Sequence, residues 1–164
     1  MIEIKKLSPD EWQKYRDIRL EALKMDPNSF SSTYEREINF TEVDWRSRSE
    51  NMRVALINGQ AVGMIGLITN TLQSTKHNAL IVSFWVKPDF RRQGLGRQLI
   101  VKLQEEASDL CLRKLWLTVT TTKREAIRLY EKLGFKHVGL LKDNLRKGDI
   151  FLDEFLMEWF APPQ

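Results

Sequence analysis

The stretch Phe90-Arg91-Arg92-Gln93-Gly94-Leu95-Gly96-Arg97-Gln98-Leu99-Ile100 decides the fold, because it joins an apolar strand to an amphipathic helix through a basic turn. The first N–H groups of a helix have no partner within the helix, and the helix dipole places positive charge at that end. Phosphate binds well at such a site. The two glycines leave the amides open to a ligand and can adopt angles that turn successive N–H groups inward. Because the arginines add attraction for a polyanion, the stretch predicts a phosphate site built from main-chain groups.

Two other glycine-rich turns bind phosphate, and the residues here exclude both. The P-loop requires a Lys-Ser or Lys-Thr pair after its last glycine, and neither Gly94 nor Gly96 is followed by one. The dinucleotide-binding fingerprint requires a third glycine, and Leu99 occupies that position. A turn that needs glycine only for its geometry stays open as an alternative.

Residues 91–96, with the pattern Arg-x-x-Gly-x-Gly, resemble the R/Q-x-x-G-x-G/A signature of the GNAT N-acetyltransferase superfamily. Residues 86–89, Val-Lys-Pro-Asp, look like the segment that precedes this signature in many members. Residues 126–135, Ala-Ile-Arg-Leu-Tyr-Glu-Lys-Leu-Gly-Phe, are similar to the family's A-x-x-L-Y-x-x-x-G-F segment. Spaced motifs in the correct order are far more specific than a glycine turn alone.

The resemblance implies an enzyme that transfers an acetyl group from acetyl-CoA directly to a primary amine of a small molecule or peptide, in a ternary complex. The turn would hold the pyrophosphate of acetyl-CoA. The backbone of Val86 would contact the pantetheine arm or the thioester carbonyl. Tyr130 occupies the position of the family's general acid, which protonates the leaving thiolate. The cofactor-binding residues implied are Val86, Arg91, Arg92, Gln93, Gly94, Leu95, Gly96, Arg97 and Lys123.

Two of these assignments have plain alternatives. Tyr130 shares an apolar helix face with Ala126, Ile127 and Leu133, so its position alone favours a packing role. Lys123 stands where many members carry an asparagine that contacts the cofactor. A lysine there would meet a CoA phosphate or remain a solvated residue of the first helical turn.

The general base is missing from the positions that the resemblance favours. Residues 80–83, before the turn, contain no carboxylate, and the next strand has Thr118 at the corresponding place. Alternation makes Asp153 the only acid on an apolar face of the last strand, so it is a candidate base. Glu35 and Glu37 follow the first helix, where family members commonly line the acceptor pocket, and are candidate substrate contacts. The alternatives are solvated glutamates and a hydrogen-bonded structural aspartate.

Length and composition predict a single domain over residues 1–164, because 164 residues that are 42% hydrophobic can bury a substantial core. No stretch approaches the roughly 18 apolar residues of a membrane span, and no basic-then-apolar leader begins the chain. We therefore expect a cytoplasmic protein without membrane contact. Cys111 is the one cysteine, and no Cys/His spacing suits a metal or a covalent acyl-enzyme. The net charge of +4 favours acidic ligands. It leaves nucleic-acid binding open as an alternative, although we expect no nucleic-acid partner.

The order of elements predicts an α/β fold with a mixed sheet. The resemblance implies that this sheet is mostly antiparallel and flanked by helices. The resemblance implies that a splayed parallel strand pair forms the acetyl-CoA cleft. The expected strands cover residues 2–7, 53–58, 60–69, 78–87, 114–120, 136–141 and 150–159. The expected helices follow Ser8 and Thr41 and cover about 94–110 and 124–133. Asn58-Gly59 suits a type I′ hairpin turn.

The sequence does not identify the acceptor. Specificity is expected in residues 28–51 and 143–149, which match no motif. A homodimer is compatible with the resemblance, since dimers are common in the family. Because a base is missing from its usual positions, a non-catalytic acyl-CoA-binding module is the alternative function.

Overall fold

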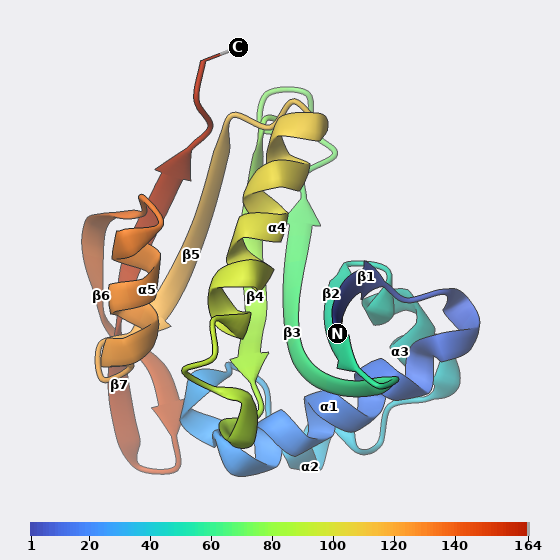
Figure 1. Ribbon diagram of the computed structural model, residues 1–164. Coiled ribbons are helices and arrows are strands. Elements are labelled where there is room, and N and C mark those ends of the chain that lie inside the picture. The colour runs from blue at the N-terminus through green and yellow to red at the C-terminus, as the bar shows by residue number, and fades with distance from the viewer. Residues whose placement is uncertain (164) are drawn as a thin grey trace. The chain divides into compact units, whose positions relative to one another are not determined.

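Seven strands form one mixed sheet in the order β1-β2-β3-β4-β5-β7-β6 (Figure 1). The computed structural model describes residues 1–163. The strands are β1 (Ile2–Lys6), β2 (Met52–Ile57), β3 (Gln60–Thr69), β4 (Asn78–Val86), β5 (Lys114–Thr120), β6 (Lys136–Lys147) and β7 (Ile150–Phe160). β4 and β5 pair in parallel, through residues 78–80 and 114–116, whereas β1-β2, β2-β3, β5-β7 and β6-β7 are antiparallel. This mixed, mostly antiparallel sheet with flanking helices confirms the expected fold class.

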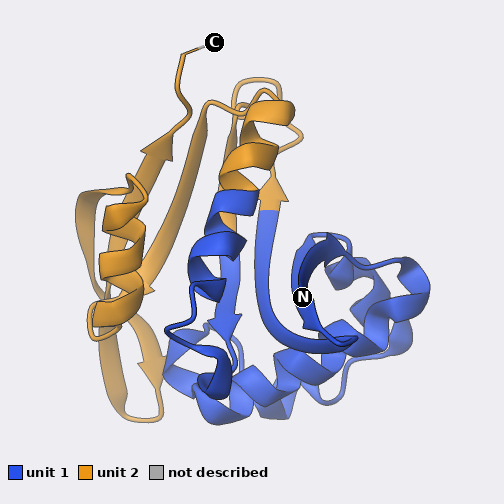
Figure 2. Cartoon of the chain, in the orientation of Figure 1, with its two compact units in different colours: residues 1–67, 82–102 blue, residues 68–81, 103–164 orange. Residues whose placement is uncertain are grey.

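The chain forms two compact units, which Figure 2 colours separately. Unit 1 comprises residues 1–67 and 82–102, and unit 2 comprises residues 68–81 and 103–164. Strand β4 and helix α4 (Leu95–Asp109) each contribute residues to both units. The expectation of a single domain stays a prediction.

In unit 1, two helices pack beside the β1-β2-β3 strands: α1 (Trp12–Met25) and α3 (Glu42–Ser49). Along the sequence, a short 3-10 helix (Pro27–Ser29) and the single-turn helix α2 (Tyr34–Glu37) lie between these two helices. Large apolar side chains fill the core, among them Tyr15, Ile18, Leu23, Trp45, Met64 and Trp85. The β2-β3 turn has φ of 51° at Asn58 and 79° at Gly59, as a type I′ turn requires. Helix α2 was not expected, because one turn carries no helical periodicity.

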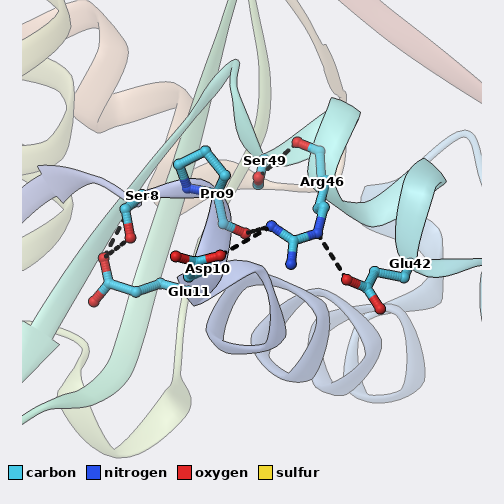
Figure 3. Close-up of polar contacts among 7 residues, drawn as sticks. All are labelled: Ser8, Pro9, Asp10, Glu11, Glu42, Arg46 and Ser49. Atoms are coloured by element: carbon cyan, nitrogen blue, oxygen red, sulfur yellow. Dashed lines mark hydrogen bonds and ion pairs between the residues drawn. The ribbon is translucent and has the colours of Figure 1, made fainter.

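Local sequence signals set the start of α1. Ser8 and Glu11 form a reciprocal capping box around the 3-10 helix Pro9–Glu11, which leads into α1 (Figure 3). The Arg46 guanidinium of α3 donates to the Pro9 carbonyl at 2.6 Å and pairs with Glu42 at 2.8 Å. The bond to Pro9 ties α3 to the chain that enters α1.

In unit 2, helix α5 (Arg124–Lys132) covers one face of the β5-β7-β6 strands (Figure 1). It ends at Gly134, whose φ of +92° is the left-handed conformation common after a helix. Phe135 then packs between the rings of Tyr130 and Trp159, with centroid distances of 5.5 and 6.5 Å.

Strand β6 corrects one expected boundary. It continues to Lys147 rather than ending at residue 141, although its pairing with β7 shifts between Leu141 and Leu145. Residues 142–147 are mostly polar, since β6 is the edge strand, and they show no apolar alternation. Part of the segment expected to hold specificity, residues 143–149, is therefore strand.

Candidate functional site

The glycine turn lies between the end of β4 and the start of α4, in unit 1. A 3-10 helix (Pro88–Phe90) leads into it, and two of its residues are left-handed, Arg92 with φ of 61° and Gly94 with φ of 82°. Gln98 N donates to Gly94 O at 3.1 Å, so the N–H groups of residues 95–97 precede the first bond of the helix. The geometry therefore suits an anion held by backbone amides.

Gly94 and Gly96 differ in what they contribute. Gly94 needs its positive φ, and a Cβ atom built there would meet nothing within 4 Å, so the space above it is open. Gly96 lies in the first turn of α4 and is half-buried. Leu95 is buried and anchors the turn to the core, whereas Arg92, Gln93 and Arg97 are exposed.

Arg91 is engaged with the protein itself. Its Nε donates to the Val86 carbonyl at 2.8 Å, and its Nη2 donates to Asp26 Oδ2 at 2.8 Å. Asp26, just past α1, also accepts from Trp85 Nε1 at 2.7 Å. The Arg91 guanidinium lies 5.8 Å from the Trp85 ring centroid. The positive charge of Arg91, which was expected to attract phosphate, is thus paired with the Asp26 carboxylate. Through these contacts Arg91 holds the turn against β4 and the end of α1.

A buried ion pair lies beside β4 in the same unit. Arg19 of α1 donates to both carboxylate oxygens of Glu37 at 2.9 Å and to Ser83 Oγ at 3.0 Å. Glu37 is 0% exposed, so the alternative interpretation of Glu37 as a solvated charge is wrong. Burial by itself would raise the pKa of Glu37, but the hydrogen bonds and charge of Arg19 outweigh it and lower that pKa. Glu35 is exposed, in agreement with the interpretation of this residue as a solvated glutamate.

Ser83 interrupts the regular backbone of β4. Its φ is 57°, a left-handed value that is unusual for a non-glycine residue inside a strand. Such backbone strain persists only where neighbouring contacts hold it, and the hydrogen bond from Arg19 is one such contact. Neither Arg19 nor Ser83 follows from a local sequence signal.

Tyr130 is buried on α5 in unit 2, and its ring packs at 5.5 Å from that of Phe135. Burial raises the pKa of the Tyr130 phenol above its usual value. The phenol therefore keeps its proton through the neutral range, as a proton donor must. Lys123 precedes α5, and its N–H donates to Thr120 O at 3.0 Å.

Asp153 and Glu154 are neighbours on β7, so their side chains lie on opposite faces of the strand. Asp153 is half-buried, and its Oδ1 accepts from the Asp143 N–H at 2.8 Å. Glu154 is buried and accepts from Asn144 Nδ2 at 2.7 Å. Sequence alternation selected Asp153 because its face looked apolar. It missed Glu154, whose burial depends on the neighbouring strands.

Two features of the described part of the chain concern other kinds of site. Residues 1–163 contain no group of three or more His, Cys, Asp or Glu side chains that could hold a metal ion. Within the same residues, none of the helices combines the length and the apolar character needed to cross a membrane.

Comparisons with known proteins agree with the fold and identify a family. Residues 12–135 match the acetyltransferase (GNAT) family. The [ribosomal protein bS18]-alanine N-acetyltransferase of Escherichia coli K12 is 38% identical over 65 residues, which is 40% of this chain and 44% of that protein. The chain thus matches less than half the length of this curated relative.

Solved structures share the fold over nearly the whole chain. A GNAT-family acetyltransferase from Streptococcus pneumoniae has a TM-score of 0.85 at 22% identity, covering 99% of this chain and 100% of its own. The Salmonella typhimurium protein yncA, solved with its cofactor acetyl-CoA, has a TM-score of 0.85 at 17% identity, covering 100% of this chain and 96% of its own. Since the family match spans most of the sequence, the chain belongs to the GNAT family of acetyltransferases.

Proposed function

We propose that this protein transfers the acetyl group of acetyl-CoA to a primary amine by direct attack in a ternary complex. The observation that carries the proposal is the turn 91–97, with its left-handed residues Arg92 and Gly94 at the start of α4. Amides that precede the first helical bond hold a pyrophosphate without any positively charged side chain. The family match over residues 12–135 and the acetyl-CoA reported for yncA support the same cofactor.

The residues of the turn divide into two groups in this proposal. The backbone of residues 92–97 binds the pyrophosphate, and Arg92, Gln93 and Arg97 surround it from exposed positions. Arg91 keeps the turn in place and, through the Val86 carbonyl, fixes the end of β4. The backbone of Val86 contacts the pantetheine arm or the thioester carbonyl. Lys123 contributes a positive charge toward a CoA phosphate.

Unit 2 supplies the proton chemistry. The amine nitrogen attacks the thioester carbonyl carbon, the C–S bond breaks, and Tyr130 gives its proton to the departing thiolate. The phenol suits this role because burial keeps it protonated. Its base partner is one of the two acids on β7, Asp153 or Glu154.

The acceptor is an amine on a peptide or a small molecule, for which Glu35 supplies an exposed carboxylate next to α2. The curated relative acts on the alanine of ribosomal protein bS18, so a free N-terminal alanine is the first acceptor to test. The cytoplasmic location, the homodimer and the splayed strand pair stay predictions.

An acceptor panel tests the proposal. Purified protein is mixed with acetyl-CoA and, in turn, a peptide with N-terminal alanine, a peptide with a lysine and a blocked N-terminus, and a linear polyamine. Free thiol is followed with a thiol reagent, and the acetylated product by mass spectrometry. We expect amine-dependent thiol release together with one added acetyl group.

Two other results would point elsewhere. If desulfo-CoA binds in calorimetry but no amine releases thiol, the protein is an acyl-CoA-binding module. If desulfo-CoA gives no binding heat, the turn does not hold the cofactor and the proposal fails.

A further inference from the structure

We infer that the Glu154 carboxylate on β7 and the Thr120 hydroxyl on β5 together bind the ammonium group of the acceptor, and that Glu154 removes its proton. The inference rests on the proposed function and deepens it by naming the amine-binding pair and the base.

Thr120 and Glu154 are direct partners in the antiparallel β5-β7 ladder. Residues opposite each other in such a ladder share one face, with Cβ atoms about 5 Å apart. Both side chains are buried, Thr120 at 4% exposure and Glu154 at 7%. A hydroxyl and a carboxylate are therefore held close together on one face of the strands, away from bulk water.

Both groups have unused capacity to accept hydrogen bonds. Among residues 1–163, Thr120 Oγ1 is buried without a hydrogen-bond partner, a state that proteins seldom leave without a reason. Glu154 receives one hydrogen bond, from the neutral amide of Asn144 at 2.7 Å. A buried carboxylate usually has a cation beside it, and within the described residues Glu154 has none.

Glu37 shows what a satisfied buried carboxylate looks like in this protein. It is the other buried acid in the described residues, and it pairs with Arg19 at 2.9 Å and lies 3.8 Å from Arg48. Its oxygens are used by the protein's own cations. Glu154 is the buried acid that still requires a positive charge from a ligand.

An alkylammonium group matches this pair chemically. It carries one positive charge and three N–H donors, so it can donate to the Glu154 carboxylate and to Thr120 Oγ1 at once. The pair would therefore select a primary amine. Asn144 would hold the carboxylate during this contact through its 2.7 Å hydrogen bond.

The proton balance follows from the same contact. One N–H bond of the ammonium breaks, its proton passes to a Glu154 oxygen, and the nitrogen keeps the electron pair. That pair forms the new N–C bond at the thioester carbonyl, and the C–S electrons leave with sulfur, which takes a proton from Tyr130. The amide nitrogen loses its remaining extra proton to the tyrosinate, and Glu154 returns its proton to solvent.

Asp153 is less suited to this role. Its Oδ1 already accepts from the Asp143 N–H at 2.8 Å, and its side chain lies on the opposite face of β7 from Glu154. Thr120 on β5 and Leu141 on β6, the residues paired with Glu154, carry no titratable group. The two neighbouring acids therefore give a matched pair of variants.

The first test compares Glu154→Gln with Asp153→Asn, using the panel amine with the highest wild-type turnover as the probe. We expect Glu154→Gln to lower kcat/KM by about 100-fold or more, with an unchanged Kd for desulfo-CoA. Asp153→Asn, the variant of the competing candidate, should lower kcat/KM far less than Glu154→Gln does, and Glu154→Asp should restore part of the loss. The rate of Glu154→Gln should also recover as the pH approaches the pKa of the amine, because more of the amine is then already neutral.

The second test removes the Thr120 hydroxyl. Thr120→Val keeps the shape of the side chain and deletes an unpartnered buried hydroxyl, so the protein should unfold at an equal or higher urea concentration. The KM for the amine should nevertheless rise several-fold with little change in kcat. Thr120→Ser, which keeps the hydroxyl, should retain the wild-type KM.

The outcomes separate the two proposals. If wild-type protein acetylates an amine but Glu154→Gln retains its kcat/KM, or Asp153→Asn causes the large loss, this inference is wrong and the proposed function stands. If Thr120→Val leaves the KM for the amine unchanged, the hydroxyl does not bind it. If wild-type protein acetylates no amine on the panel, the proposed function fails and this inference fails with it.

Discussion

Arg91 contributes to the turn as a brace, because its guanidinium is bound by the Val86 carbonyl and the Asp26 carboxylate, both at 2.8 Å. Asp26 and Arg91 are 65 residues apart in sequence, so this contact joins the end of α1 to the loop before α4. Ser83 is held in a comparable way by Arg19. Arg19 of α1 and Asp26, just past α1, thus support Ser83 and the glycine turn.

Tyr130→Phe tests the proposed role of Tyr130 as the general acid. We expect kcat to fall by about 100-fold, with an unchanged Kd for desulfo-CoA, because the ring still packs on Phe135. Since burial raises the pKa of the phenol, wild-type kcat should show no decline from its ionisation below about pH 10. Stopped assays across this pH range measure both effects.

Tyr15→Phe provides the control for Tyr130→Phe, since Tyr15 is a second buried tyrosine, in the core of unit 1. It should retain wild-type kcat. Equal kcat for wild type and Tyr130→Phe would exclude Tyr130 as the acid.

Arg19→Met tests the buried ion pair. The substitution leaves Glu37 charged and buried without its two hydrogen bonds at 2.9 Å, so the free energy of unfolding should fall by about 3–5 kcal/mol. Replacing both residues by methionine should cost less than the sum of the single changes. Urea unfolding at neutral pH measures all three variants. A strictly additive double variant would show that the two side chains do not stabilise each other.

The pH dependence of this pair has a defined sign. Glu37 has a lowered pKa in the folded protein, so its contribution is present above the usual carboxyl pKa of about 4.3 and is lost as the pH falls through the lower folded value. Glu37→Gln should therefore lose less stability, relative to wild type, in acid than at neutral pH.

At the scale of elements, the helix starts carry much of the local information. The capping box of Ser8 and Glu11 fixes the entry to α1 (Figure 3). Lys14 pairs with Glu11 at 2.8 Å. Helix α4 begins in a different way, after a left-handed glycine, and its first amides precede the first hydrogen bond of the helix, from Gln98 N to Gly94 O. The two starts differ because one stabilises the fold and the other, as we propose, binds phosphate.

Glu11→Gln removes the charge from the capping box. The hydrogen bond from Lys14 and the backbone hydrogen bond from Ser8 lower the pKa of Glu11 to about 2. The free energy of unfolding of wild type should therefore exceed that of the variant by about 1 kcal/mol at neutral pH. This difference should shrink as the pH falls from about 4.3 toward the lower pKa of Glu11 in the folded protein. Urea unfolding at several pH values measures it. Glu3→Gln on β1, an exposed control, should show no such trend.

Gly94→Ala tests the backbone of the turn. Alanine at a φ of +82° should lower the free energy of unfolding by about 1 kcal/mol, and relaxation of the turn should weaken binding of desulfo-CoA. Gly139→Ala is the matched control, because a Cβ there also meets nothing within 4 Å and no positive φ is required. If both variants bind desulfo-CoA like wild type, the left-handed conformation of Gly94 has no role in binding.

At the scale of the whole molecule, the net charge of +4 and the glycine turn predict that binding of acetyl-CoA stabilises the folded protein. Acetyl-CoA at about 100 times its Kd should stabilise the protein by about 2.7 kcal/mol, and added salt should reduce the effect by screening the phosphates. Thermal unfolding with increasing acetyl-CoA measures this. Double-stranded DNA at equal phosphate concentration should give no comparable shift. A DNA shift without an acetyl-CoA shift would favour nucleic-acid binding.

Much of the fold could be predicted from sequence because its signals are local. The Asn58-Gly59 turn, the cap at Ser8 and the glycine after α5 each depend on a few consecutive residues. The β6 boundary could not be predicted, because residues 142–147 gain their strand pairing from β7 and not from their own composition. Local chemistry indicates turns and helix ends, whereas an edge strand depends on its partner.

The sequence by itself determined the family, the order of the elements and the position of the glycine turn, since motif spacing and hydrophobic periodicity require only neighbouring residues. Only the tertiary structure decided how the charged side chains are used. It pairs Glu37 with Arg19 and Arg91 with Asp26, and it buries Glu154 rather than Asp153. The physical reason is that burial and charge pairing depend on strands and helices that are distant in the chain, and neither is encoded at a single position.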